Sequence, residues 1–167
     1  MVFCRSQTKV GNEVAPRSEI SRFITLDYVD VSSSTSYNYA FDTLPKGTIV
    51  RWEDGYSYNG WVKISYYKYG SGSKITGYVP STLVCPYGEC FYTTAQSGLH
   101  LRKSSSASSE SLAVIPYNTF VQIHSGTFTN GWGRCTVLEG TYDGLSGYVS
   151  QSYVSQYNGV YNWWTNQ

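Results

Sequence analysis

Apolar and polar residues alternate with a period of two in short stretches along most of the chain, and Gly, Pro, Asn and Ser separate these stretches. Such alternation is typical of half-buried β-strands, whose successive side chains point to opposite faces. The clearest stretches are 48–52, 60–66, 75–79 and 120–124. No apolar stripe with a 3.6-residue period is long enough for a helix. The pattern predicts an all-β protein.

Three sequence blocks occur twice, in the same order and nearly the same spacing. Residues 44–50 (LPKGTIV) return as 115–121 (IPYNTFV), 59–61 (NGW) as 130–132 (NGW), and 77–81 (GYVPS) as 147–151 (GYVSQ). The offset shortens by a single residue at the third block, which indicates a duplicated domain rather than a chance match.

The duplication predicts four parts in the chain. They are a linker or N-terminal arm (1–25), a first repeat (26–86), a second repeat (87–156) and a Trp-rich tail (157–167). Five or six short strands without a helix predict a small, partly open β-barrel for each repeat. Domains of about 60 residues bury only about 60% of their unfolded surface, so each repeat would gain from packing against its twin.

Composition and charge argue against several classes of function. Aromatic residues make up 17% of the chain and charged residues 14%, and the 17 tyrosines exceed what two small cores can hold. Within 26–86 five Lys or Arg meet five Asp or Glu, and within 92–156 three meet three. Neither repeat offers the basic face that nucleic-acid binding needs, and neutrality argues against purely electrostatic attraction to a polyanion. No apolar run reaches the ~20 residues of a membrane span, and no signal peptide is evident.

The cysteines can be interpreted either as a disulfide pair or as buried thiols. Cys85 and Cys90 lie between the repeats with C-x4-C spacing, which could close a small disulfide loop. Cys135 takes the place of Ile64 in the first repeat, which favours a buried, small apolar side chain.

Metal binding and catalysis find little support. Zinc is disfavoured because no second cysteine pair follows and the histidines, His100 and His124, fall in predicted strands. No cysteine precedes a helical pattern that would activate it, and carboxylates are too sparse for a glycosidase pair. We therefore predict no catalytic residue, no metal and no cofactor.

Aromatic side chains in the turns favour ligand binding instead. Tyr and Trp stack on sugar C–H surfaces while their OH or N–H forms hydrogen bonds, at low entropic cost. The predicted ligand-binding residues are Asp54, Tyr56, Tyr58, Trp61, Tyr67 and Tyr69 in the first repeat, and Phe128, Asn130, Trp132 and Tyr142 in the second. Structural alternatives stay open for several of them. Trp61 and Trp132 also suit a half-buried core position, the loop tyrosines suit solvated loops or packing between repeats, and Asp54 suits a solvated turn.

The second repeat resembles the bacterial SH3 domain. Its ordered signals are Leu99-x-Leu101-Arg102, a Ser-rich loop, 112–116 (LAVIP), Val121-x-Ile123, 130–135 (NGWGRC) and 147–149 (GYV). The first repeat resembles the family mainly over 44–83, because 29–32 (VDVS) lacks the arginine and the following loop is shortened and Tyr-rich. The resemblance implies two small SH3-like β-barrels in tandem.

In that family, paired copies occur at the C-termini of cell-wall hydrolases such as phage endolysins, bacteriocins and autolysins. The resemblance implies a non-catalytic targeting region, with peptidoglycan, wall teichoic acid or another wall polysaccharide of a Gram-positive host as partner. It also implies an N-terminal catalytic domain in the parent chain. A phage-encoded protein of this kind would be made in the host cytoplasm without a signal peptide and act at the cell wall; otherwise it would be extracellular.

Two other functions stay open. The chain could be a protein- or peptide-binding adaptor, although the Trp-Trp pair at 163–164 lies beyond the second repeat rather than inside a strand as in the eukaryotic relatives. It could also be a complete hydrolase. Two weak wall sites on one chain would reinforce each other through effective concentration, so an isolated repeat should bind poorly.

Overall fold

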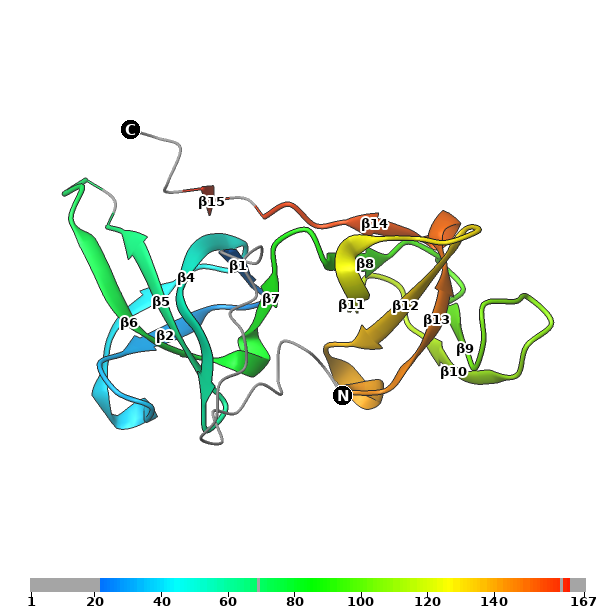
Figure 1. Cartoon of the computed structure of the whole chain (residues 1–167), viewed down its shortest axis with the longest axis horizontal. Helices are drawn as coiled ribbons and strands as arrows, with labels where there is room; N and C mark the ends of the chain where they lie inside the picture. The colour runs from blue at the N-terminus through cyan, green and yellow to red at the C-terminus, as the bar shows by residue number, and fades with distance from the viewer. Residues whose placement is uncertain (1–21, 69, 160, 163–167) are drawn as a thin grey trace. The chain divides into compact units, whose positions relative to one another are not determined.

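The computed structural model describes residues 22–68, 70–159 and 161–162. These residues form two compact units (Figure 1). The first unit contains the described residues up to 87 together with those from 158 onward, and the second unit contains 88–157. Each unit is built around its own antiparallel β-sheet.

The first unit carries its strands in the order β3-β2-β6-β5-β4-β1-β7. Their bounds are β1 (Arg22–Thr25), β2 (Val29–Ser32), β3 (Ala40–Leu44), β4 (Thr48–Tyr58), β5 (Trp61–Tyr67), β6 (Lys74–Pro80) and β7 (Val84–Pro86). Two 3₁₀ turns, η1 (Tyr37–Tyr39) and η2 (Ser81–Leu83), connect strands, and β15 (Tyr161–Asn162) pairs in parallel with β4.

The second unit repeats this topology, with the order β10-β9-β13-β12-β11-β8-β14. Its strands are β8 (Cys90–Thr93), β9 (Leu99–Arg102), β10 (Ser111–Ile115), β11 (Phe120–Ile123), β12 (Trp132–Val137), β13 (Ser146–Ser150) and β14 (Val154–Gln156). Its 3₁₀ turns are η3 (His124–Gly126), η4 (Gly140–Tyr142) and η5 (Gln151–Tyr153). The prediction of an all-β protein with two small barrel-like domains is confirmed.

The repeated Asn-Gly-Trp block forms the same hairpin in both units. Asn59 and Gly60 have φ values of 50° and 83°, and Asn130 and Gly131 have 51° and 78°. Two successive residues with positive φ make the type I′ turn that matches strand twist, which explains why Asn and Gly occupy these positions. Trp61 and Trp132 therefore begin β5 and β12 at equivalent places.

The repeated Gly-Tyr-Val block has a packing cause. A Cβ atom built on Gly147 would lie 2.7 Å from the carbonyl oxygen of Arg102, and one on Gly77 would lie 2.9 Å from that of Ser32. Only glycine allows β13 and β6 to cross the neighbouring strand so closely. Opposite Gly147 lies Cys135, fully buried in the core, and opposite Gly77 lies Ile64.

Two segments differ from the sequence-based expectation. Residues 22–25, which the sequence predicts as part of the arm, form β1, which pairs with β4 and β7. Phe23, Ile24 and Thr25 are all buried, so this short strand lacks the alternation that would have revealed it. The sequence also predicts a turn region over 53–59, which carries Asp54, Tyr56 and Tyr58, but residues 53–58 continue β4 through a shift in register between Trp52 and Ser57. The rest of the predicted arm (1–21) and Trp163-Trp164 lie outside the described residues.

Among the described residues, no helix has the length and apolar character that crossing a membrane requires.

Candidate ligand-binding groove

Strand register gathers a set of side chains on one face of the second unit. Trp132 lies opposite Ser150, and Tyr148 lies opposite both Arg134 and Arg102. Residues directly opposite each other in an antiparallel pair share a face, so β9, β12 and β13 present these side chains together.

Trp132 lines an open groove with a volume of about 340 Å³. Its lining residues are Ala95, Ser97, Gly98, Leu99, His100, Arg102, Ala107, Trp132, Ser150 and Tyr153. Trp132 is half-buried, and Tyr153, on η5, is 51% exposed. Partly exposed aromatic rings combined with a few polar groups are what small binding sites in proteins usually contain.

The Ser-rich loop between β9 and β10 positions Arg102. The guanidinium Nη1 donates a 2.7 Å hydrogen bond to the carbonyl oxygen of Ser109. The loop is closed by Lys103 N–H to Glu110 O at 3.0 Å and by Ser104 N–H to Ser109 Oγ at 3.0 Å. Arg102 thus lines the groove with one of its nitrogens fixed by the loop.

The equivalent place in the first unit is covered. Trp61 is only 8% exposed, and the ring of Tyr37 lies against it edge-on, with the centroids 4.7 Å apart. Ser32 occupies the position of Arg102, because it pairs with Tyr78 as Arg102 pairs with Tyr148. Its hydroxyl donates to the carbonyl oxygen of Ser36, in the turn that carries Tyr37. The two repeats therefore share topology and differ in surface.

Asp54 organises the irregular end of β4. Its Oδ1 accepts a hydrogen bond from Tyr56 N–H at 3.2 Å, and its Oδ2 accepts one from the Tyr58 hydroxyl at 2.7 Å. The hydrogen bond to Asp54, helped by burial and the carboxylate charge, raises the pKa of Tyr58 to about 12. Tyr58 also lies edge-on to Tyr78, with centroids 6.0 Å apart. Asp54, Tyr56, Tyr58 and Trp61 thus belong to one hairpin, and ligand contact by them stays a prediction.

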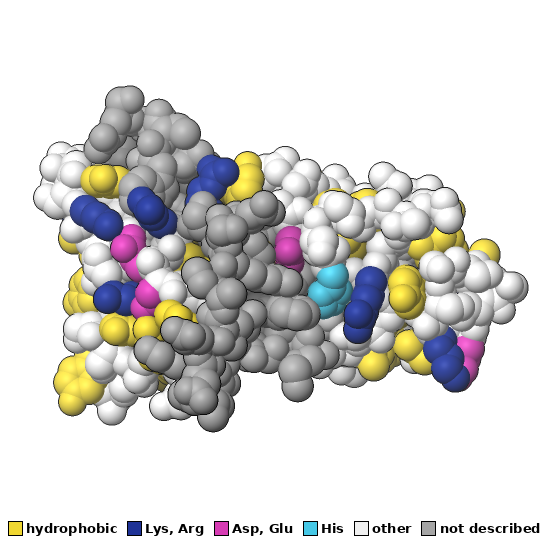
Figure 2. Space-filling model, in the orientation of Figure 1, with side chains coloured by type: hydrophobic (Ala, Val, Ile, Leu, Met, Phe, Trp, Pro, Cys, Tyr) yellow, Lys and Arg dark blue, Asp and Glu magenta, His cyan; other side chains and the backbone are white. Residues whose placement is uncertain are grey.

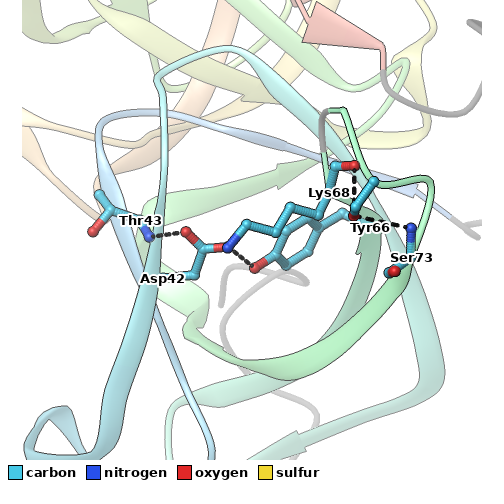
Figure 3. Close-up of polar contacts among 6 residues, drawn as sticks. Asp42, Thr43, Tyr66, Lys68 and Ser73 are labelled. Atoms are coloured by element: carbon cyan, nitrogen blue, oxygen red, sulfur yellow. Dashed lines mark hydrogen bonds and ion pairs between the residues drawn. The ribbon is translucent and has the colours of Figure 1, made fainter.

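Tyr67 contributes to a different, smaller hollow of about 180 Å³ lined also by Asp42, Tyr66 and Lys68. Figure 3 shows Asp42 between its neighbours: its Oδ2 accepts a 2.7 Å hydrogen bond from the Tyr66 hydroxyl, and Lys68 Nζ lies 3.9 Å from the same oxygen. The backbone N–H of Thr43 donates to Oδ1 at 3.0 Å. Tyr69 lies outside the described residues.

Tyr66 makes the first unit sensitive to alkaline pH. Burial, with Asp42 beside it, raises the pKa of this phenol above its ordinary value. A group whose pKa is higher in the folded state contributes its full stability below its unfolded pKa of about 10 and loses that contribution as the pH rises further. We expect the free energy of unfolding to fall above pH 10, by at most about 1.4 kcal/mol per pH unit from this group. Tyr66→Phe should flatten the slope in denaturant titrations at pH 9 to 11, whereas the same change at exposed Tyr39 should not.

In the second unit, Trp132 alone of the four predicted residues lines the groove. Phe128 packs edge-on against Phe91, with centroids 5.5 Å apart, and both Phe128 and Tyr142 lie against the core. Asn130 is an exposed turn residue. Tyr153 and Arg102 also line the groove, although the sequence pattern did not indicate Tyr153 and indicated Arg102 only as part of the family motif. A difference between the repeats could have indicated both residues: the first repeat has Leu83 at the position of Tyr153 and Ser32 at the position of Arg102.

Among the described residues, Cys85 and Cys90 do not form the small disulfide loop that their spacing allowed. Cys85, Cys90 and Cys135 are each fully buried. Burial raises the pKa of the Cys135 thiol to about 12, so this group stays protonated at neutral pH. Over the residues that the structure describes, no three His, Cys, Asp or Glu side chains lie together as a metal site would require.

Charged side chains of both signs lie side by side on the molecular face drawn in Figure 2. Ion pairs among the described residues include Lys74 with Glu53 at 3.1 Å, Lys103 with Glu110 at 3.3 Å, and Lys68 with Asp42 at 3.9 Å. Mixed charge of this kind argues against recognition of a ligand by a large surface of one sign.

Comparison with known proteins gives matches to a protein family and to solved structures. No curated protein matches the chain. It is similar to the structure of NlpC2 from Trichomonas vaginalis, with 15% identity over 81% of this chain and 47% of that one, and a TM-score of 0.32. It is also similar to NlpC1 from the same organism, with 13% identity over 93% of this chain and 50% of that one, and a TM-score of 0.34. The chain thus spans about half the length of these two proteins.

The family described as "Bacterial SH3 domain" matches residues 97–155, which include β9 to β13, η5 and all but one residue of the groove lining. Residues 97–155 of the second unit are therefore similar to the bacterial SH3 domain.

Proposed function

We propose that the chain is a non-catalytic module that binds the bacterial cell wall and directs a lytic enzyme to it. In this proposal the parent protein is a phage endolysin with a separate catalytic domain. The ligand is peptidoglycan or a wall-linked polymer of a Gram-positive host, and the site of action is the wall.

One observation carries the proposal: the open groove lined by Trp132 and Tyr153 lies within the segment that matches the bacterial SH3 family. The rings of these residues offer flat apolar surfaces for stacking, and Ser97, Ser150 and Arg102 beside them supply hydrogen bonds. Such a site can hold a repetitive ligand without metal or cofactor. Because the first unit covers its equivalent Trp61 with Tyr37, we place the primary contact in the second unit.

Sedimentation tests this function. The full chain, fused to a fluorescent protein, is mixed with purified Gram-positive walls and centrifuged, and the fluorescent protein alone serves as control. The fusion should pellet with walls from at least one host and stay soluble without them. If it remained in the supernatant with walls from every plausible host, the proposal would be wrong.

A protein- or peptide-binding adaptor is the second candidate, and exposed aromatic side chains at Tyr37, Tyr39 and Phe41 of the first unit favour it. Retention by a protein partner, combined with no retention on stripped peptidoglycan, would identify this function.

A further inference from the structure

We propose that the groove of the second unit selects a peptide that ends in a free carboxylate, and that Arg102 binds this carboxylate. The inference rests on the proposed function, since wall peptides are the source of such ends. It specifies which part of the wall the groove recognises.

The charge of the groove points to an anionic ligand. Its lining includes Arg102 and His100 but no Asp or Glu. Within the described part of the chain, Arg102 has no carboxylate at ion-pair distance, and its hydrogen bond to Ser109 uses one of five N–H donors. His100 lies in the same lining, and its Nδ1 is 2.7 Å from Ser111 Oγ. The groove thus holds the positive charge of Arg102 and guanidinium N–H donors that the described residues do not satisfy.

The geometry of Arg102 suits a planar anion. A guanidinium can bind both oxygens of a carboxylate through two parallel N–H···O bonds, and these charge-assisted bonds are the stronger kind. The bond from Nη1 to the Ser109 carbonyl holds the side chain in place before any ligand arrives. Less conformational freedom is then lost on binding.

The remaining lining favours a peptide over a polyol phosphate. Ala95, Leu99 and Ala107 join Trp132 and Tyr153 in giving the groove apolar surface. Small apolar side chains of a peptide would pack there, whereas the units of a polyol phosphate are polar throughout. A volume of about 340 Å³ is near the lower limit for ligand sites, which suits the end of a short peptide. A single arginine also offers little to a polymer with a charge on every unit.

The first unit supplies an internal comparison. It has Ser32 where the second has Arg102, and Tyr37 covers Trp61. The proposal therefore assigns the carboxylate preference to the second unit alone. Arg102→Ser introduces the residue that the same fold already accepts in the first unit.

The test uses the full chain and two probes, N-acetyl-Ala-Ala-Ala with a free C-terminus and the same peptide with a C-terminal amide. Binding is followed by NMR shifts of the Trp132 indole N–H. We expect the free acid to bind about tenfold more tightly than the amide. Arg102→Ser should abolish that preference, while Lys103→Ser, at the exposed neighbour paired with Glu110, should retain it. Arg102→Lys keeps the positive charge but loses the paired N–H donors of the planar guanidinium, so it should retain only part of the preference. This variant preserves the test if Arg102→Ser fails to fold.

Equal binding of the two peptides, or an undiminished preference in Arg102→Ser, would overturn the inference. Poly(glycerol phosphate) is the competing source of negative charge. If it displaced the peptide at a lower concentration of charged groups than the free acid itself requires, the inference would also be wrong.

Failure of this inference is distinguishable from failure of the proposed function. Wall sedimentation through Trp132 without discrimination between the peptides overturns the carboxylate preference alone. Discrimination without sedimentation on any wall supports the preference of the groove for a carboxylate and overturns the wall as its source.

Discussion

Trp132→Ala should lower binding of the full chain to purified Gram-positive walls by about tenfold or more, since truncating a central aromatic contact commonly has an effect of this size. Trp132 lines the groove and is half-buried, so its ring is available to a ligand while its position in β12 holds it in place. The measurement is the dissociation constant from sedimentation at increasing wall concentration.

Tyr117→Ala is the matched control for Trp132→Ala. Tyr117 is 49% exposed on the same unit and does not line the groove, so its removal should leave wall binding within twofold. Circular dichroism of both variants checks that each remains folded. Unchanged wall binding in a folded Trp132→Ala variant would move the wall site elsewhere, with the hairpin of Asp54, Tyr58 and Trp61 as the next region to test.

Gly147→Ala should destabilise the second unit by about 1–3 kcal/mol, the usual cost of forcing an extra carbon into a packed site. The added Cβ would lie 2.7 Å from the Arg102 carbonyl oxygen and 2.9 Å from Leu101 Cγ. A backbone oxygen cannot rotate away, so β9 and β13 would have to separate. For a domain of this size, that loss lowers the midpoint of thermal unfolding by roughly 5 to 20 °C. Calorimetry measures it.

Ser146→Ala is the control for Gly147→Ala, because it adds no atom at the crossing of the strands. Its loss is limited to the 2.8 Å hydrogen bond between Ser146 Oγ and Thr136 Oγ1, of the order of 1 kcal/mol. A Gly147→Ala variant as stable as Ser146→Ala would show that the close approach of β9 and β13 is not what requires glycine here. Gly147→Ala should also weaken ligand binding, since Arg102 lies at the same crossing.

The strands could be predicted where alternation was clean, as in β5 and β6, and the turns where Asn-Gly specified positive φ. Prediction failed at β1, whose consecutive buried residues carry no period. It also failed along 53–58, where the extra residues of β4 resembled a turn. In both places pairing with another strand, rather than the local pattern, creates the structure.

The candidate site could be predicted only in part. Asn-Gly placed Trp132 at the start of a strand, and the groove lies beside it. Phe128 was predicted as a ligand contact because it lies near the same turn. Gly133 has no side chain, however, and this leaves room for the Phe128 ring to pack toward Phe91. Tyr153 and Arg102 are 51 positions apart in the chain. Only the pairing of β9 with β13 and the turn of η5 bring them to one groove.

The amino-acid sequence alone determined that this chain is built from β-strands, that its plan is duplicated, and that the second copy resembles a bacterial SH3 domain. Period-two alternation and turn-forming residues act locally, so they can be read without coordinates. The tertiary structure decided which of the two tryptophans that follow Asn-Gly, Trp61 and Trp132, is accessible to a ligand. Tyr37 covers Trp61, whereas the Ser-rich loop leaves Trp132 beside an open groove, because burial depends on neighbours contributed by distant parts of the chain.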